Sequence, residues 1–141
     1  MATEEYNGST WGSGGALPTA TVNAGAAGNT PAGLLFGGTT QTTPNATATY
    51  EYNGSSWTSG GSLPAGRSYN SGAGTQTAAL AIGGSSTYSP ISPGYTAATG
   101  EYDGSSWTAG GTMNTAGVRS NSAGTQTAAM VGNAPGEFSQ F

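Results

Sequence analysis

The chain lacks the side chains on which most catalytic and metal-binding sites depend. Its 141 residues include no cysteine and no histidine. Disulfides, thiolate metal sites and thiol nucleophiles are therefore excluded. The most common general base and the imidazole metal ligand are missing as well. The sequence therefore predicts a protein that is not an enzyme, with no metal site and no cofactor.

Charge is also scarce. Charged residues make up 6% of the chain, and the only two cations, Arg67 and Arg119, stand against six acidic residues. Without a basic patch the chain cannot hold phosphate backbones, so nucleic acid is not an expected partner. The longest apolar run, residues 78–82, is too short to span a membrane, and no signal peptide is recognisable. We expect a soluble protein; its location stays unknown.

What the chain does contain is a repeat. One seven-residue motif occurs at residues 5–11, 51–57 and 101–107, in the form Glu-Tyr-Asn/Asp-Gly-Ser-Ser/Thr-Trp. Its tryptophans, Trp11, Trp57 and Trp107, are 46 and then 50 residues apart. A repeat of this length indicates one supersecondary unit stacked on copies of itself.

One unit predicts four short antiparallel strands, because apolar and β-branched segments alternate with turn residues. The Asn53-Gly54 pair predicts a two-residue type I′ hairpin turn, in which both residues need a positive φ. Helices are not expected, since 26 glycines are spread along the chain and no stripe of 3.6-residue period exists. The expected strands cover residues 47–52, 55–58, 68–73 and 78–82. Residues 74–77, Gly-Thr-Gln-Thr, are predicted to form a tight turn and not a phosphate loop, because they lack the lysine and the following helix.

The order of a double glycine, a tyrosine and a tryptophan resembles the blades of kelch-type β-propellers. Gly37-Gly38, Tyr52 and Trp57 carry this pattern, as do Gly83-Gly84, Tyr102 and Trp107. The repeat is also similar, in the style of its amino-acid sequence, to kelch-like arrays of bacteriophage and marine metagenomic proteins. The resemblance covers almost the whole chain and implies an all-β propeller of four-stranded antiparallel blades. It further implies that the aromatic residues are structural and pack between blades: Tyr6, Trp11, Tyr52, Trp57, Tyr102 and Trp107.

The repeat divides the chain into a single domain, residues 1–141, that begins and ends within a blade. We expect a half-blade at 3–15, whole blades at 16–61 and 62–111, a half-blade at 112–133 and a tail at 134–141. Three blade equivalents are too few for a ring, since known rings have about four to eight. A homodimer solves this, because two chains give six blades and each N-terminal half-blade completes the partner's C-terminal one by strand exchange. A fragment of a longer propeller, an open solenoid and prion-like disorder are the alternatives.

Residues that break the repeat are candidates for ligand binding, because the architecture does not require them. They are Tyr69, Tyr88, Tyr95, Arg67 and Arg119. Tyr88 and Tyr95 lie on the connection that varies most in length between units, where an exposed aromatic could stack on a sugar or anchor a protein. The two arginines lie near the expected innermost strand and could face the channel mouth. In the structural alternative, the tyrosines pack the loop down and the arginines pair with glutamates.

Carboxylates offer little further chemistry. Glu5, Glu51 and Glu101 occupy one repeat position, so we expect hairpin flanks in solvent and not a converging pair of the kind glycosidases use. No calcium-loop pattern surrounds Asp103 or Glu137. The leading hypothesis is a non-catalytic module for binding or assembly. It would belong to a phage surface or tail-associated protein that recognises a glycan or a protein. The alternative is a structural or engineered self-assembling propeller fragment without a ligand.

Overall fold

The computed structural model describes residues 1–87, 94–118 and 120–132. This part of the chain holds twelve strands and no helix, so the predicted all-β class is confirmed. Within these ranges no helix has the length and apolar character needed to cross a bilayer.

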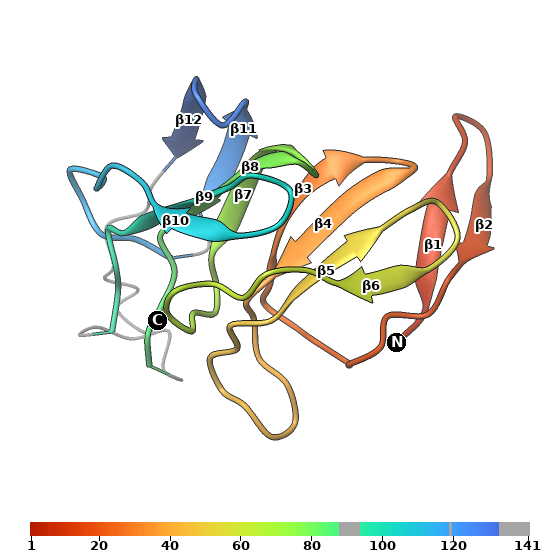
Figure 1. Ribbon diagram of the computed structural model, residues 1–141, viewed down its shortest axis with the longest axis horizontal. Helices are drawn as coiled ribbons and strands as arrows, with labels where there is room; N and C mark the ends of the chain where they lie inside the picture. Colours follow the sequence, from red (N-terminus) through yellow and green to blue (C-terminus); the bar gives the residue numbers. More distant parts are fainter. Residues whose placement is uncertain (88–93, 119, 133–141) are drawn as a thin grey trace, which may run out of the picture.

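The strands form four antiparallel sheets, in each of which the strands are adjacent in chain order (Figure 1). The N-terminal half-sheet contains β1 (Thr3–Tyr6) and β2 (Trp11–Gly14). The first full sheet contains β3 (Gly25–Asn29), β4 (Ala32–Phe36), β5 (Thr49–Tyr52) and β6 (Trp57–Ser59). The second full sheet contains β7 (Ser71–Thr75), β8 (Ala78–Ile82), β9 (Thr99–Tyr102) and β10 (Trp107–Ala109). The C-terminal half-sheet contains β11 (Asn121–Gly124) and β12 (Ala129–Gly132).

The predicted type I′ turn at Asn53-Gly54 is wrong. Tyr52 pairs with Trp57, so residues 53–56 form a four-residue loop. Gly54 has a φ of 91°, whereas Asn53 is not among the residues with positive φ. The Asn53 side-chain Oδ1 instead accepts hydrogen bonds from the backbone N–H groups of the second and third residues after it, at 3.0 and 2.9 Å. The side chain therefore closes the loop in place of a tight backbone turn.

The other two copies of this loop are built in the same way. Asn7 and Asp103 each accept two backbone hydrogen bonds from the serine and the serine or threonine that follow. At Asp103 these bonds, with the Ser106 N–H as the largest cause, lower the pKa of the carboxyl to about 2. The exposed loop is thus fixed by one acceptor side chain in every repeat.

The strands made of small residues, β3, β7 and β11, lie next to one another where the sheets converge. The Ser122 hydroxyl on β11 donates a 2.7 Å hydrogen bond to the Gly72 carbonyl on β7. A side chain at Gly72 would collide with the Ala26 carbonyl on β3, so only glycine permits this approach. The strand β7 starts at Ser71, three residues later than predicted, because Ser68 makes only an isolated bridge to Ser85.

The hydrophobic core lies between the two full sheets. Phe36 on β4 is fully buried and meets Trp107 on β10, with ring centroids 4.9 Å apart in an edge-on arrangement. Leu34, on the same face of β4, is 1% exposed. In a chain with so many small residues, these aromatics supply most of the large buried side chains. The core cluster consists of Leu34, Phe36, Leu63, Ala79, Ala81, Tyr102 and Trp107.

Candidate assembly interface

One set of polar contacts joins the second full sheet to the first. The Tyr102 hydroxyl donates a short hydrogen bond to Glu51 and accepts one from the Gly61 N–H at 3.4 Å. The indole Nε1 of Trp107 donates to the Thr49 hydroxyl at 2.9 Å. Tyr102 and Trp107 stack against each other with ring centroids 4.9 Å apart. An aromatic pair of one sheet is thus held by a carboxylate, a hydroxyl and a backbone amide of the preceding sheet.

The same set occurs one repeat earlier, between the first full sheet and the N-terminal half-sheet. The Tyr52 hydroxyl donates to Glu5 and accepts from the Gly15 N–H at 3.1 Å. Trp57 Nε1 donates to the Thr3 hydroxyl at 2.9 Å. Because both junctions use equivalent residues, the contact belongs to the repeat and not to one sheet. We call this set the aromatic junction.

The aromatic junction corrects the prediction for two of the three glutamates. Glu5 and Glu51 are not hairpin flanks in solvent; both are half-buried acceptors of tyrosine hydroxyls. Burial and the bond to Glu51 raise the pKa of Tyr102 to about 12. The bond to Glu5, followed by burial, also raises the pKa of Tyr52. Glu101, which has no following full sheet in the chain, is exposed as predicted.

Glutamines add a further contact, not predicted from the sequence, between the two full sheets and between the second full sheet and the C-terminal half-sheet; the equivalent position in the first unit is Thr30. The Gln76 amide donates to the carbonyls of Gly33 and Tyr52 at 2.9 and 2.6 Å. The Gln126 amide repeats this with Ala79 and Tyr102 at 3.0 and 2.7 Å. The signal was present in the identical segments 73–79 and 123–129, which retain one long polar side chain among small ones. Each hairpin therefore reaches back onto the sheet before it.

The exposure of the repeated tryptophan follows the completeness of the preceding sheet. Trp107 packs against a full sheet and is 7% exposed. Trp57 packs against the N-terminal half-sheet and is half-buried. Trp11 has no preceding sheet in the part of the chain that the structure describes, and it is 68% exposed. One side chain in one local structure therefore shows three exposures that depend only on its neighbour.

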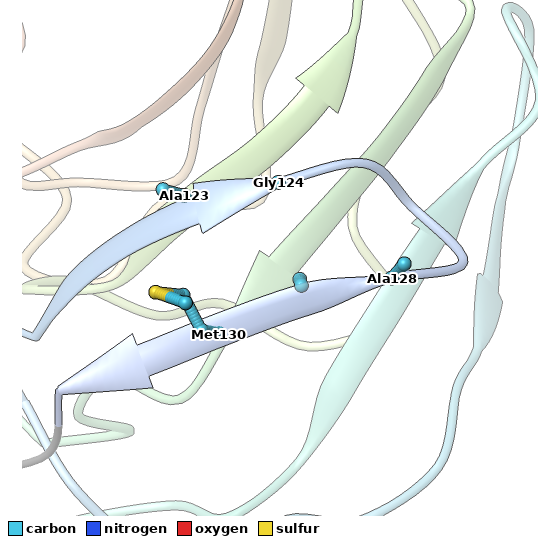
Figure 2. A pocket seen from close by; sticks show the side chains of 5 residues that line it. Ala123, Gly124, Ala128 and Met130 are labelled. Atoms are coloured by element: carbon cyan, nitrogen blue, oxygen red, sulfur yellow. The ribbon is translucent and has the colours of Figure 1, made fainter.

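The opposite face of each sheet shows the same series. Leu34, covered by a full sheet, is 1% exposed; Leu80, covered by the C-terminal half-sheet, is half-buried; Met130 at the end is 73% exposed. Met130 lines a hollow on the C-terminal half-sheet, where it projects from β12 towards Ala123 on β11 (Figure 2). The exposed members of the two series, Trp11 and Met130, therefore lie on the two outer sheets of the described residues.

These two ends carry complementary halves of the aromatic junction. The N-terminal half-sheet presents the aromatic pair, Tyr6 and Trp11, with ring centroids 5.2 Å apart. The second full sheet presents the groups that would receive this pair, at the positions of Glu51, Thr49 and Gly61. These groups are Glu101, Thr99 and Gly111, of which Glu101 and Gly111 are exposed. Nothing lies within 4 Å of the position where a Cβ would stand at Gly111.

The residues predicted to bind a ligand lie outside the aromatic junction. Arg67 is 5% exposed, so it does not face an open channel mouth, and its Nη1 donates to the carbonyls of Gly83 and Ala98 at 3.4 and 3.1 Å. The expected pairing with a glutamate is wrong for this arginine, and burial lowers the pKa of its guanidinium. Tyr88 and Arg119, as well as Glu137, lie outside the described residues.

Tyr69 and Tyr95 are brought onto neighbouring segments. Ser85 bridges both Ser68, which precedes Tyr69, and Tyr95 itself. Both tyrosines are half-buried, and Tyr69 adopts a φ of 55°. Among the described residues, no group of three or more acidic, cysteine or histidine side chains could hold a metal ion.

Comparison with known proteins assigns no family. No family model matches the chain, and no curated protein sequence matches it. The function must therefore be inferred from the geometry of the aromatic junction.

The raised pKa of Tyr102 makes stability depend on alkaline pH. A pKa of about 12 in the folded state, against 10.0 in the unfolded chain, stabilises the fold fully below pH 10. This contribution is lost as pH rises from 10 to 12; solvent screening keeps it below the about 3 kcal/mol that corresponds to two full pKa units. Urea unfolding across this range should show the loss in the wild type and in Tyr50→Phe, whose hydroxyl lies outside the junction. The loss should be clearly smaller in Tyr102→Phe; an equal loss would contradict the assignment.

Proposed function

We propose that this chain is a non-catalytic, self-assembling module of the β-propeller type, in which two copies close a six-bladed ring. The observation that carries the proposal is the exposure series of Trp107, Trp57 and Trp11, at 7%, intermediate and 68%. A repeat position that is buried whenever a full sheet precedes it is left open only at the end of the chain. A second copy would supply the missing neighbour.

The strand count supports two copies. Each chain contributes two sheets of four strands and two sheets of two strands. If each C-terminal half-sheet joins the N-terminal half-sheet of the other copy, two chains give six four-stranded sheets. Six lies within the range of about four to eight blades in known propellers, whereas the three sheet equivalents of one chain lie below it. The double-glycine, tyrosine and tryptophan pattern supports the same architecture by its resemblance to kelch blades.

Ring closure also removes two exposed features that cost free energy. The outer edges of β1 and β12 pair with no strand among residues 1–87, 94–118 and 120–132, and open edges invite uncontrolled association. Trp11 and Met130 are large apolar side chains left in water. Full burial of one such side chain contributes about 1.5–3 kcal/mol, and each junction of the ring would bury both. Two junctions together can offset the entropic cost of association, which is of order 4–15 kcal/mol.

A second candidate function is recognition of a glycan or a protein, as proposed for a phage surface or tail-associated protein. It is favoured by a bond between the loops of neighbouring sheets: the Asn45 side chain donates to the Ser86 carbonyl at 2.9 Å. The Ser68 hydroxyl in turn donates to Asn45 at 2.8 Å. The loops after β4 and β8 are therefore fixed to each other, and the second of them carries Tyr95. A preorganised loop surface of this kind suits a ligand site.

The proposed assembly predicts the mass in solution. Light scattering on a size-exclusion column should give twice the chain mass of 13.7 kDa. Trp11→Ala should shift the population towards the single chain, because it removes the largest side chain of the junction. Thr42→Ala, at an exposed position in the loop after β4 and away from both outer sheets, serves as the control and should remain dimeric. A wild-type mass of 13.7 kDa at every concentration would sink the proposal.

The recognition candidate predicts a different result. Tyr95→Ala should weaken binding to a glycan array or to cell surfaces at least tenfold while leaving the mass unchanged. The same substitution at Tyr6 should change the mass first. No binding by the wild-type dimer at millimolar glycan and to intact cells would remove this candidate and leave assembly alone.

A further inference from the structure

We infer that the ring closes through one defined strand pairing, between β12 of one copy and β1 of the second. In the proposed register Ala129 faces Tyr6, Met130 faces Glu5, Val131 faces Glu4 and Gly132 faces Thr3. This inference rests on the proposed function and adds to it the strands, the register and the residues of the partner surface. The occupant is a second copy of this chain.

The register follows from two pairings already present within the chain. Between β8 and β9, Ala79 pairs with Tyr102 and Leu80 with Glu101. Between β4 and β5, Leu34 pairs with Glu51, which is the same relation one repeat earlier. The repeat places Met130 at the position of Leu34 and Leu80, and Glu5 at the position of Glu51 and Glu101. Both internal examples therefore give the same partner for Met130.

The strand edges are available for this pairing. Among the strands that the structure describes, β12 pairs only with β11, and β1 pairs only with β2. Joining them yields a four-stranded sheet in the order β11-β12-β1-β2, which is the order of both full sheets in the chain. A slip of one residue would turn every side chain of β1 to the other face, so the contacts of the flanking sheets select a single register.

The composite sheet places the aromatic pair of the second copy over the second full sheet. The Tyr6 hydroxyl then stands where Tyr102 stands at the first junction, so it donates to Glu101 and accepts from the Gly111 N–H. The indole of Trp11 donates to the Thr99 hydroxyl, which bonds the Gly111 carbonyl at 2.6 Å in the single chain. Every group of the aromatic junction thus finds its partner.

Apolar burial follows the same arrangement. Trp107 packs edge-on against Phe36, and the equivalent of Phe36 in the second full sheet is Ile82. Trp11 of the second copy therefore packs beside Ile82, which is already 3% exposed in the single chain, and covers the half-buried Leu80. Met130, in the place of Leu34, packs against the Tyr52 and Trp57 rings of the second copy. The large exposed side chains Tyr6, Trp11 and Met130 are buried by the same step.

The chain itself indicates why a second copy is the occupant. Tyrosine and tryptophan donors stand exposed on one end, and the carboxylate, hydroxyl and amide that hold such a pair stand at the other. Both internal junctions show that these two surfaces fit each other. A different protein would have to reproduce a Glu-Tyr strand and its tryptophan hairpin at the same spacing.

Engineered disulfides test the register directly, because the natural chain has no cysteine. The double variant Val131→Cys/Glu4→Cys places two thiols at opposed positions on one face. Opposed residues of antiparallel strands have Cα atoms about 4.5–5.5 Å apart, within the range of a disulfide. Glu4 is exposed and lies outside the aromatic junction. Oxidation of the purified variant should give a covalent dimer, of twice 13.7 kDa, on a non-reducing gel.

The matched control is Gly132→Cys/Glu4→Cys, which leaves Met130 in place and meets no crowding at position 132. It shifts one thiol by a single residue, so the two Cβ atoms point to opposite faces of the sheet. We expect at least tenfold less covalent dimer from this control. Mixing the single variants Val131→Cys and Glu4→Cys gives a second test that avoids the double substitution. The mixture should form a covalent dimer, whereas each single variant alone should not.

The outcomes separate the register from the assembly. A dimeric mass by light scattering, without a disulfide between the cysteines introduced at positions 131 and 4, would overturn the register and leave the proposed function standing. Equal cross-linking in the control would do the same. A mass of one chain would overturn both. A ladder of covalent polymers would support the strand pairing but contradict a ring of two copies.

Discussion

The contact between a tyrosine–tryptophan pair and the face of the preceding sheet is the interaction on which the rest of this structure depends. Tyr102 and Trp107 bring a large apolar surface to the junction, and Glu51 and Thr49 satisfy their polar atoms. A buried aromatic with its hydroxyl or indole N–H paired stabilises the fold without leaving an unsatisfied polar group. In a chain with 26 glycines and three tryptophans, few other side chains could supply this area.

The remaining architecture adapts to this contact. The aromatic side chains fill the part of each junction where the sheets are far apart. Where the sheets lie close together, the strands must carry small side chains, so β3, β7 and β11 consist largely of glycine, alanine and serine. The close approach at Gly72 is one consequence. Two glutamine hairpins then fasten the second full sheet to the first and the C-terminal half-sheet to the second. Every junction joins a sheet to its predecessor, and in the described residues the two outer sheets have two strands each and leave Trp11 and Met130 exposed.

Much of the fold could be predicted from the sequence because its signals are local. The strand at residues 78–82 and the all-β class follow from apolar runs between turn residues, and both agree with the structure. The four-residue loop at Asn53 was not predicted, because an Asn-Gly pair suits a two-residue turn equally well and the side-chain bonds decide between them. The roles of Glu5, Glu51 and Arg67 were missed for a different reason. Their partners lie on other sheets or distant loops, and no periodicity within one strand reports how sheets face each other.

The central claim is that the outer edges of β1 and β12 are complementary surfaces which a second copy fills. Hydrogen exchange of their backbone amides measures this most directly, because an amide pointing out from a free edge exchanges with water while one in a strand pair is protected. At high protein concentration, the outward amides of β1 and β12 should be protected as strongly as those of β5 and β8, and dilution should release them together. Rapid exchange of these amides at every concentration, beside protected β5 and β8, would contradict the account.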